Sequence, residues 1–143
     1  MAETINLQVV TPQRHILEDN VDAVEIPGKD GYLGVLPGHA PLITELGVGI
    51  LAYRKGSETR HLTVIRGYAE VLASRVIVLA EVAEKAEEID SDRARTAQER
   101  AKAELAKVGA GTPEWQEQTE AIDRAAVRLQ AVGRSRAARE PVS

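Results

Sequence analysis

The residue composition changes sharply near residue 83, and this change limits how the chain can fold. From residue 5 to about residue 82, short aliphatic runs rich in Val and Ile alternate with turn residues. From Ala83 onward Ala, Glu, Lys, Arg and Gln predominate and β-branched residues become sparse, which is typical of helices. The sequence therefore predicts a β domain over residues 1–86 and a helical domain over residues 87–143.

The first part reads as a series of short strands. Residues 22–26 and 61–65 alternate apolar and polar side chains at or near period two, as half-buried strands do. Residues 76–80 are apolar throughout, which favours a central strand with both faces covered. The turn signals between these runs include Pro27-Gly28, Asp30-Gly31, Pro37-Gly38 and Arg66-Gly67. This spacing predicts an all-β sandwich or barrel.

The second part carries start and stop signals for two helices. Asp90 or Ser91 can cap the first helix, which we expect to end at Gly109-Ala110-Gly111. Thr112-Pro113 can open the second helix, and Pro141 prevents its continuation. Two helices joined by a short glycine loop predict an antiparallel hairpin.

The seam between these helices is expected to be narrow and weak. Apolar residues recur at helical spacing at Ala94, Ala97, Ala101, Leu105 and Val108 and, on the second helix, at Trp115, Ile122 and Leu129. Each buried methylene contributes only about 0.8 kcal/mol, so a seam rich in alanine holds the helices loosely. We expect a hairpin that can open or change its position.

Composition excludes several classes of function. The chain has no cysteine, which excludes disulfides, thiol catalysis and Cys-based zinc sites. A net charge of −4 offers no basic field, so we expect no nucleic-acid partner. No apolar run approaches the roughly 18 to 20 residues that span a bilayer, and the N-terminus lacks a signal-peptide pattern. We therefore expect a cytoplasmic protein without direct lipid insertion.

No set of residues converges on a catalytic pattern. His15, His39 and His61 lie in separate segments, with no nucleophile or metal-ligand spacing around them. A hydrolase that uses His39 is a poor alternative because no partner base or nucleophile can be named. His61 lies in an alternating strand and is expected to be a structural residue, either on the polar face or with its hydrogen bonds satisfied. The acidic run over residues 81–92 lacks the spacing of a calcium loop and indicates a solvated linker. We expect no enzyme, no metal and no required cofactor.

Arginines on the predicted helices are spaced as two pairs. The pairs are Arg93 with Arg100, seven residues apart, and Arg124 with Arg128, four residues apart. Together they could bind a polyanion. Spacing alone favours the alternative, in which they are solvated or pair locally with residues such as Glu104 and Glu120. Three further arginines near the end of the second helix complement the helix dipole or could meet an acidic partner; these are Arg134, Arg136 and Arg139.

Three stretches, in this order, carry a family resemblance. They are VVTP at residues 9–12, IPGKDGYLGVLPGHAPL at residues 26–42 and IDSDRA at residues 89–94. Over essentially its whole length the chain resembles the epsilon subunits of bacterial F-type ATP synthases. The middle stretch is very specific, whereas the third alone would be weak.

The resemblance implies a fold and a function. It implies a ten-stranded β-sandwich of two sheets followed by the two-helix hairpin. The sandwich would join the gamma subunit to the c ring at the foot of the rotating central stalk. The hairpin would either fold against the sandwich or extend to the alpha and beta subunits and block ATP hydrolysis. Such a protein is non-catalytic and peripheral, on the cytoplasmic face of the bacterial inner membrane.

The resemblance also implies site residues. A regulatory ATP would be held by Glu84, Asp90, Arg93, Ala94, Arg100, Arg124 and Arg128. Partner contacts would be made by Lys29, Asp30, Gly31, Tyr32 and His39 on the sandwich and by Arg134, Arg136 and Arg139 on the hairpin. Helical phase places Arg124 and Arg128 off the predicted seam. A generic β-sandwich binding module with a helical oligomerisation tail is the alternative, and the position of the hairpin stays open.

Overall fold

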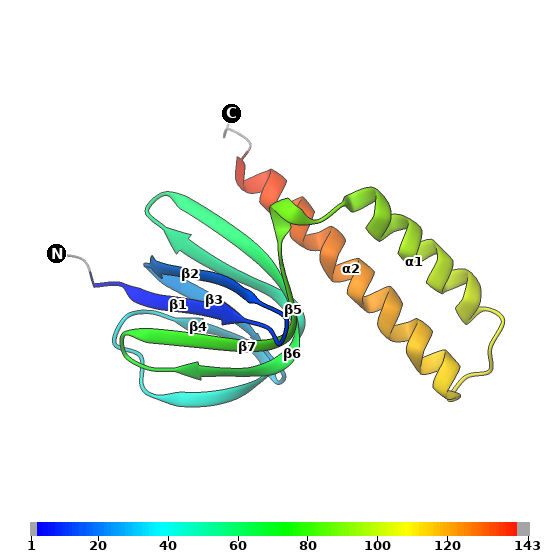
Figure 1. Ribbon diagram of the computed structural model, residues 1–143, viewed down its shortest axis with the longest axis horizontal. Helices are drawn as coiled ribbons and strands as arrows, with labels where there is room; N and C mark the ends of the chain where they lie inside the picture. The colour runs from blue at the N-terminus through cyan, green and yellow to red at the C-terminus, as the bar shows by residue number, and fades with distance from the viewer. Residues whose placement is uncertain (1–2, 140–143) are drawn as a thin grey trace.

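The computed structural model describes residues 3–139 and shows a β domain with a helical hairpin packed on one side (Figure 1). The strands are β1 (Ile5–Val10), β2 (His15–Val21), β3 (Ala23–Gly28), β4 (Gly31–Val35), β5 (Leu42–Lys55), β6 (Glu58–Val71) and β7 (Arg75–Lys85). A single 3-10 turn, η1 (Ala86–Glu88), leads to the helices α1 (Ser91–Leu105) and α2 (Pro113–Arg139).

The strands form one continuous hydrogen-bonded sheet in the order β2-β1-β7-β6-β5-β3-β4. Only the β1–β7 pair is parallel among these neighbours. The three long central strands bend at one level, where the ladders skip Gly47, Arg66 and Glu81. Because each of these strands contributes to both layers, the sheet folds over into a sandwich.

The predicted count of ten strands in two separate sheets is therefore wrong. The structure has seven strands in a single sheet, although the sandwich class is confirmed. Three of the seven strands bend and so contribute two straight segments each. Such continuity is set by the hydrogen-bond ladder, which alternation along one segment does not reveal.

Arg66-Gly67 lies inside the strand β6 and is not the predicted turn between strands. Arg66 has φ 50° and Gly67 has φ 122°, both in the left-handed region. A Cβ on Gly67 would lie 2.0 Å from the carbonyl oxygen of Leu79, so only glycine fits there. These two residues stand at the level where the ladders skip one position on each strand, which is the bend that closes the sandwich.

The core fills the space between the two layers. Its fully buried side chains are aliphatic and include Ile5, Leu7, Val9, Ile26, Leu51, Leu62, Val64, Val71, Val76 and Val78. The expectation that both faces of residues 76–80 would be covered is wrong, because Leu79 is 55% exposed on the outer face. Residues 61–65, by contrast, are all buried, because α2 packs against β6 on the other layer.

The helix starts agree with the prediction, and one helix end differs. The Asp90 side chain accepts a hydrogen bond of 3.1 Å from the backbone N–H of Arg93, which makes Asp90 the N-cap of α1. The Thr112 hydroxyl accepts a 3.1 Å bond from the N–H of Trp115 at the start of α2. The helix α1 ends at Leu105, earlier than the predicted glycine stop, and tight turns connect it to Gly109.

The second helix docks on the outer face of β5 and β6, and α1 packs on α2 away from the sheet (Figure 1). Ile50 and Ala86 of the β side form an apolar cluster with Val127 and Ala131 of α2. This small cluster, which we call the docking patch, joins the hairpin to the β domain.

In the seam between the two helices, Ala94 and Ala101 are buried as predicted. Ala97 is exposed, and Trp115, Ile122 and Leu129 are only half-buried. Because α2 also has to cover the β domain, its most buried side chains lie on a different face from the predicted one.

Candidate nucleotide site and partner surfaces

The most strongly bonded candidate pair joins β7 to α2. Arg128 donates from Nε to Glu84 Oε1 at 2.8 Å and from Nη2 to Glu84 Oε2 at 2.7 Å. This parallel, charge-assisted geometry is the strongest form of an arginine–carboxylate contact. The hydrogen bond to Glu84 also raises the pKa of Arg128. Glu84 is held on the docking face because it stands opposite Thr63 in the β6–β7 ladder.

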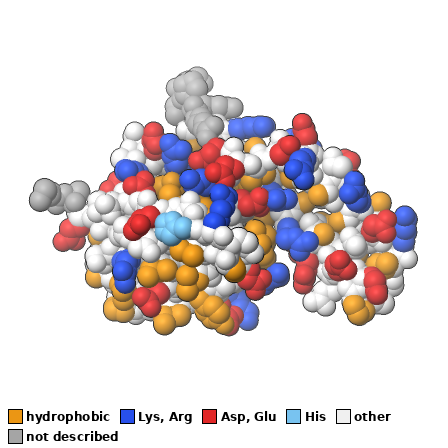
Figure 2. Space-filling model, in the orientation of Figure 1, with side chains coloured by type: hydrophobic (Ala, Val, Ile, Leu, Met, Phe, Trp, Pro, Cys, Tyr) orange, Lys and Arg blue, Asp and Glu red, His pale blue; other side chains and the backbone are white. Residues whose placement is uncertain are grey.

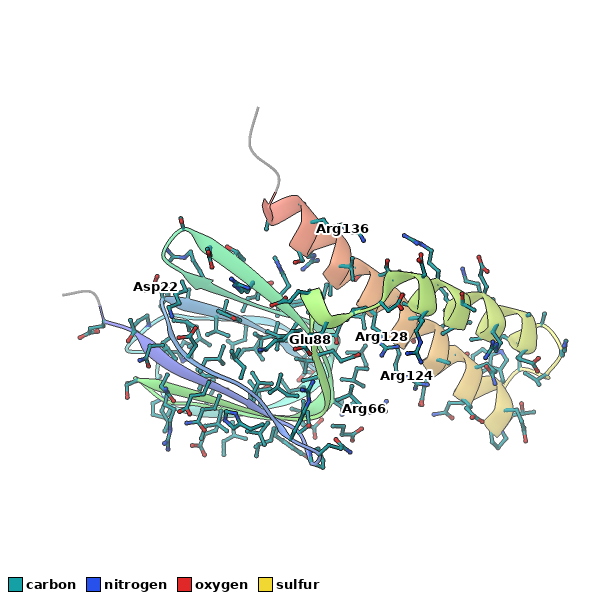
Figure 3. All side chains as sticks on the ribbon, turned by 45° about the horizontal axis from the view of Figure 1, so that its top comes forward. Asp22, Arg66, Glu88, Arg124, Arg128 and Arg136 are labelled. Carbon is teal, nitrogen blue, oxygen red and sulfur yellow. The ribbon has the colours of Figure 1, made fainter. Side chains whose placement is uncertain are left out.

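The other three arginines of the candidate site are not committed to carboxylates. Arg93 and Arg100 are exposed on α1. Arg124 is half-buried on α2, one turn before Arg128, and both are labelled in Figure 3. Among the described residues no carboxylate lies within 4 Å of these three guanidinium groups. Since α1 packs on α2, the structure leaves three cationic groups on one pair of helices.

The local pairing that spacing favoured does not occur. Glu104 pairs with Lys107 at 3.3 Å, and Glu120 accepts a hydrogen bond from Gln116 at 3.5 Å. Arg128 instead pairs across to the β domain, a partner that is remote in sequence. The remaining two candidates have structural roles: Asp90 caps α1, and Ala94 is buried between the helices at 1% exposure.

The acidic run is paired rather than simply solvated, which corrects the prediction for its first part. Besides Glu84, three of its carboxylates contact arginines from other elements: Glu81 with Arg66, Glu87 with Arg60 and Glu88 with Arg14, at 3.1 to 3.4 Å. Within residues 3–139 no group of three His, Cys, Asp or Glu side chains could hold a metal ion.

The predicted partner-contact residues of the β domain lie on the β3–β4 turn, at the start of β4 and in the loop after β4. Lys29, Asp30 and Gly31 are exposed at the turn, where Lys29 pairs with Glu45 at 2.9 Å. This contact with Glu45 raises the pKa of Lys29. His39 donates from Nδ1 to the carbonyl oxygen of Ala40 at 2.7 Å, which stiffens its loop.

Tyr32 is only partly a surface residue. Its ring is 53% exposed, but its hydroxyl accepts a 3.1 Å hydrogen bond from the backbone N–H of Ile50. A partner contact by Tyr32 would therefore involve a side chain that is already anchored inside the molecule.

His61 is buried beneath α2, at 8% exposure, so the expectation of a residue on the polar face or with satisfied hydrogen bonds is wrong. Its Nδ1 has no hydrogen-bond partner in the structure. Burial, and then the positive charge of Arg134, lowers the pKa of His61, while Glu25 and Glu87 act in the opposite direction. Arg134 and Arg136 are exposed near the end of α2, and the side chain of Arg139 lies outside the described part.

An apolar surface on the outer side of the layer formed by β1, β7, β6 and the first part of β5 was missed in the sequence. Ile43, Tyr68 and Leu79 are 71%, 54% and 55% exposed, and Tyr68 stands directly opposite Leu79. We call these three residues the outer apolar face. Figure 2 shows hydrophobic side chains gathered along the lower side of the β domain. The unbroken apolar run at residues 76–80 was the available signal, because its alternate residues had to face outward.

Comparisons with known proteins give a consistent result. Residues 4–86 match the family described as ATP synthase, Delta/Epsilon chain, beta-sandwich domain, and residues 87–133 match its long alpha-helix domain. The ATP synthase epsilon chain 2 of Syntrophotalea carbinolica is 45% identical over 134 residues, covering 94% of this chain and 97% of the relative. The ATP synthase epsilon chain of Geobacter metallireducens is 43% identical, covering 94% and 98%.

Solved structures extend the likeness to an assembled enzyme. A chain in the cryo-EM structure of the Euglena gracilis mitochondrial ATP synthase, OSCP/F1/c-ring, is 25% identical with a TM-score of 0.75. The match covers 90% of this chain and 80% of that chain. Within the described residues, no helix combines the length and apolar character needed to cross a membrane.

Proposed function

Because the chain belongs to the ATP synthase delta/epsilon chain family, we propose that it is a non-catalytic subunit of a rotary ATP synthase. It links the gamma subunit to the c ring in the central stalk and rotates with them. The observation that carries this proposal is similarity across both domains, at 45% identity over 94% of the chain. The dispersed histidines support a structural and regulatory role rather than catalysis.

Two surfaces of the β domain suit the two stalk partners. The exposed turn at Lys29, Asp30 and Gly31 and the loop at His39 are short, stiff segments on a rigid scaffold, which suits recognition of the c ring. The outer apolar face suits the gamma subunit, since exposed apolar clusters on a stable domain mark protein interfaces. The subunit thereby becomes peripheral to the cytoplasmic face of the bacterial inner membrane through its partners.

The hairpin supplies inhibition of ATP hydrolysis. A small docking patch and a single ion pair among the described residues hold α2 on the β domain, so leaving this position costs little. The 15 residues of α1 and the 27 of α2, placed end to end, span about 60 Å. The extended hairpin brings Arg134, Arg136 and Arg139 to acidic segments of the alpha and beta subunits.

ATP acts as a regulatory ligand of the docked state. The three uncommitted guanidinium groups of Arg93, Arg100 and Arg124 provide donors for phosphate oxygens, and Arg128 fixes the adjoining turn of α2 through Glu84. A ligand that binds only the docked form stabilises it by mass action. High ATP would then oppose extension of the hairpin.

Reconstitution tests the proposal. The purified chain should bind the gamma subunit with one-to-one stoichiometry and restore proton-driven ATP synthesis to enzyme stripped of this subunit. Substitution of Ile43 and Leu79 by Ser should abolish binding to the gamma subunit. The control Glu3→Gln, on the exposed N-terminal segment, should bind gamma like the parent chain. Self-association without gamma binding would instead support the oligomerisation module and overturn the proposal.

A further inference from the structure

Tyr32 belongs to the β3–β4 turn region, yet its hydroxyl reaches the strand on which α2 docks. The Tyr32 hydroxyl accepts the hydrogen bond from the backbone N–H of Ile50 at 3.1 Å. Ile50 is 1% exposed and belongs to the docking patch with Val127 and Ala131. One side chain therefore connects the turn to the surface that receives the hairpin.

The Ile50 N–H depends on Tyr32 because β3 is out of register at this point. The β3–β5 ladder pairs Glu25 with Ala52 and then resumes only at Gly28 with Leu46. The interruption takes β3 out of line with this part of β5, and the tyrosine hydroxyl supplies the acceptor. A buried N–H without an acceptor is costly, so the hydroxyl is needed to hold β5 in this shape.

Gly49 makes room for the contact. A Cβ at Gly49 would lie 2.7 Å from the Tyr32 hydroxyl oxygen and 2.6 Å from the Cβ of Pro27. The absence of a side chain therefore allows the ring to cross β5. A groove of about 290 Å³ runs beside the ring, lined on the opposite wall by α2 residues that include Asp123 and Gln130. The hydrogen bond to Ile50 therefore connects Tyr32 to the docking patch.

We propose that Tyr32 is a positioning residue that couples the conformation of the β3–β4 turn to docking of the α1–α2 hairpin. While the hydroxyl is bonded to Ile50, β5 presents Ile50 in the place that seats Val127 and Ala131. When the turn moves and withdraws the hydroxyl, the docked hairpin loses stability. If the turn binds the c ring, which rests on the proposed function, ring attachment also biases the hairpin.

The test uses the isolated full-length chain and compares Tyr32→Phe with Tyr68→Phe. Tyr68 is a control of matched exposure, 54% against 53% for Tyr32, and it stands opposite Glu45 and Leu79 in the sheet rather than against Ile50. The chain has no cysteine, so Ser74→Cys and Glu117→Cys can carry spin labels that report the distance between the β domain and α2. Tyr32→Phe should raise the undocked fraction at least threefold, and Tyr68→Phe should leave it unchanged.

A second measurement tests the coupling in the opposite direction, from the hairpin to the turn. A hydrogen bond with only a local structural role would give no effect in this direction. Coupling of two sites is mutual, so weakening the hairpin contact by Val127→Ser should shift the amide resonances of Asp30 and Gly31 in the distant turn. In a chain that already carries Tyr32→Phe, Val127→Ser should shift these amide resonances much less, because the hydrogen bond to Ile50 is already absent.

Two results would overturn the coupling. The first is an equal docked fraction in the Tyr32→Phe and Tyr68→Phe variants. The second is that Val127→Ser leaves the amide resonances of Asp30 and Gly31 unchanged. If Tyr32→Phe unfolds the β domain, the Val127→Ser measurement alone decides. No gamma or c subunit is present in these experiments, so a negative result would leave the proposed function standing, and failed gamma binding would leave this coupling standing.

Discussion

Arg128 of α2 donates two hydrogen bonds, of 2.8 and 2.7 Å, to Glu84 of β7, a residue 44 positions earlier in the sequence. Among the described residues it is the single ion pair between α2 and the β domain. The pair therefore fixes the register in which α2 lies on the sheet, while the docking patch provides apolar contact without direction.

Breaking this pair should loosen the hairpin. Glu84→Gln keeps the shape but removes the charge, so the ratio of docked to undocked chains should fall three- to tenfold, or about 1 kcal/mol, in spin-label distance distributions. Arg124→Ala is the control, because Arg124 lies one turn away without a carboxylate partner. Equal effects of the two substitutions would show that the pair does not hold the hairpin.

The isolated chain should bind ATP through the uncommitted arginines. Calorimetric titration should show one site, and Arg93→Ala or Arg100→Ala should weaken it tenfold or more by removing charge-assisted bonds to phosphate. Arg95→Ala is the matched control, since Arg95 is exposed on α1 and pairs with Asp92 at 3.1 Å. If Arg93→Ala and Arg100→Ala both bind ATP with the affinity of the parent chain, these two arginines do not belong to the site.

Docking of the hairpin should depend on pH through His61. Burial lowers the pKa of His61 in the docked state, whereas undocking exposes the ring and returns it towards its ordinary pKa of about 6.5. The undocked form therefore binds the proton more tightly. The contribution of neutral His61 to docking is complete above about pH 6.5 and declines as the pH falls towards the lowered pKa.

Spin-label distances measured between pH 5 and pH 8 check this dependence. The undocked fraction should rise a few-fold on acidification in the parent chain, with a smaller rise in His61→Asn, which cannot titrate. Arg134→Ala should also reduce the response, because Arg134 is the charge on α2 that disfavours the protonated ring. A pH profile that is identical in His61→Asn would assign the response to other groups.

Gly67→Ala should destabilise the β domain severely. The added Cβ would meet the Leu79 carbonyl at 2.0 Å and would also force alanine to φ 122°, so a loss of about 3 to 5 kcal/mol is expected in urea unfolding. Gly34→Ala, where no atom lies within 4 Å of the new Cβ, should change stability by less than about 1 kcal/mol. Similar losses in both variants would show that the bend tolerates a side chain.

Local chemistry made part of the molecule predictable. The caps at Asp90 and Thr112 are formed by residues within three positions of the groups they bond, so the sequence shows them directly. The bend at Arg66-Gly67 was mistaken for a turn because both features need a positive φ, and only the neighbouring strands distinguish them.

Contacts between remote segments were the unpredictable part. The docking of Val127 on Ile50 and the pairing of Arg128 with Glu84 depend on how α2 is laid across the sheet. Neither spacing on α2 nor alternation on β5 contains that relationship. Four arginines were identified as a set, but their division into one paired and three uncommitted groups required the folded structure.

The position of β7 in the sheet determines the order in which the two domains can fold during synthesis. As the last strand, β7 lies between β1 and β6, so the first and last strands of the β domain are neighbours. The nascent β domain stays incomplete, with its apolar interior open, until residue 85 has left the ribosome. The hairpin follows immediately behind it, and its docking surface on β5 and β6 is shaped only then.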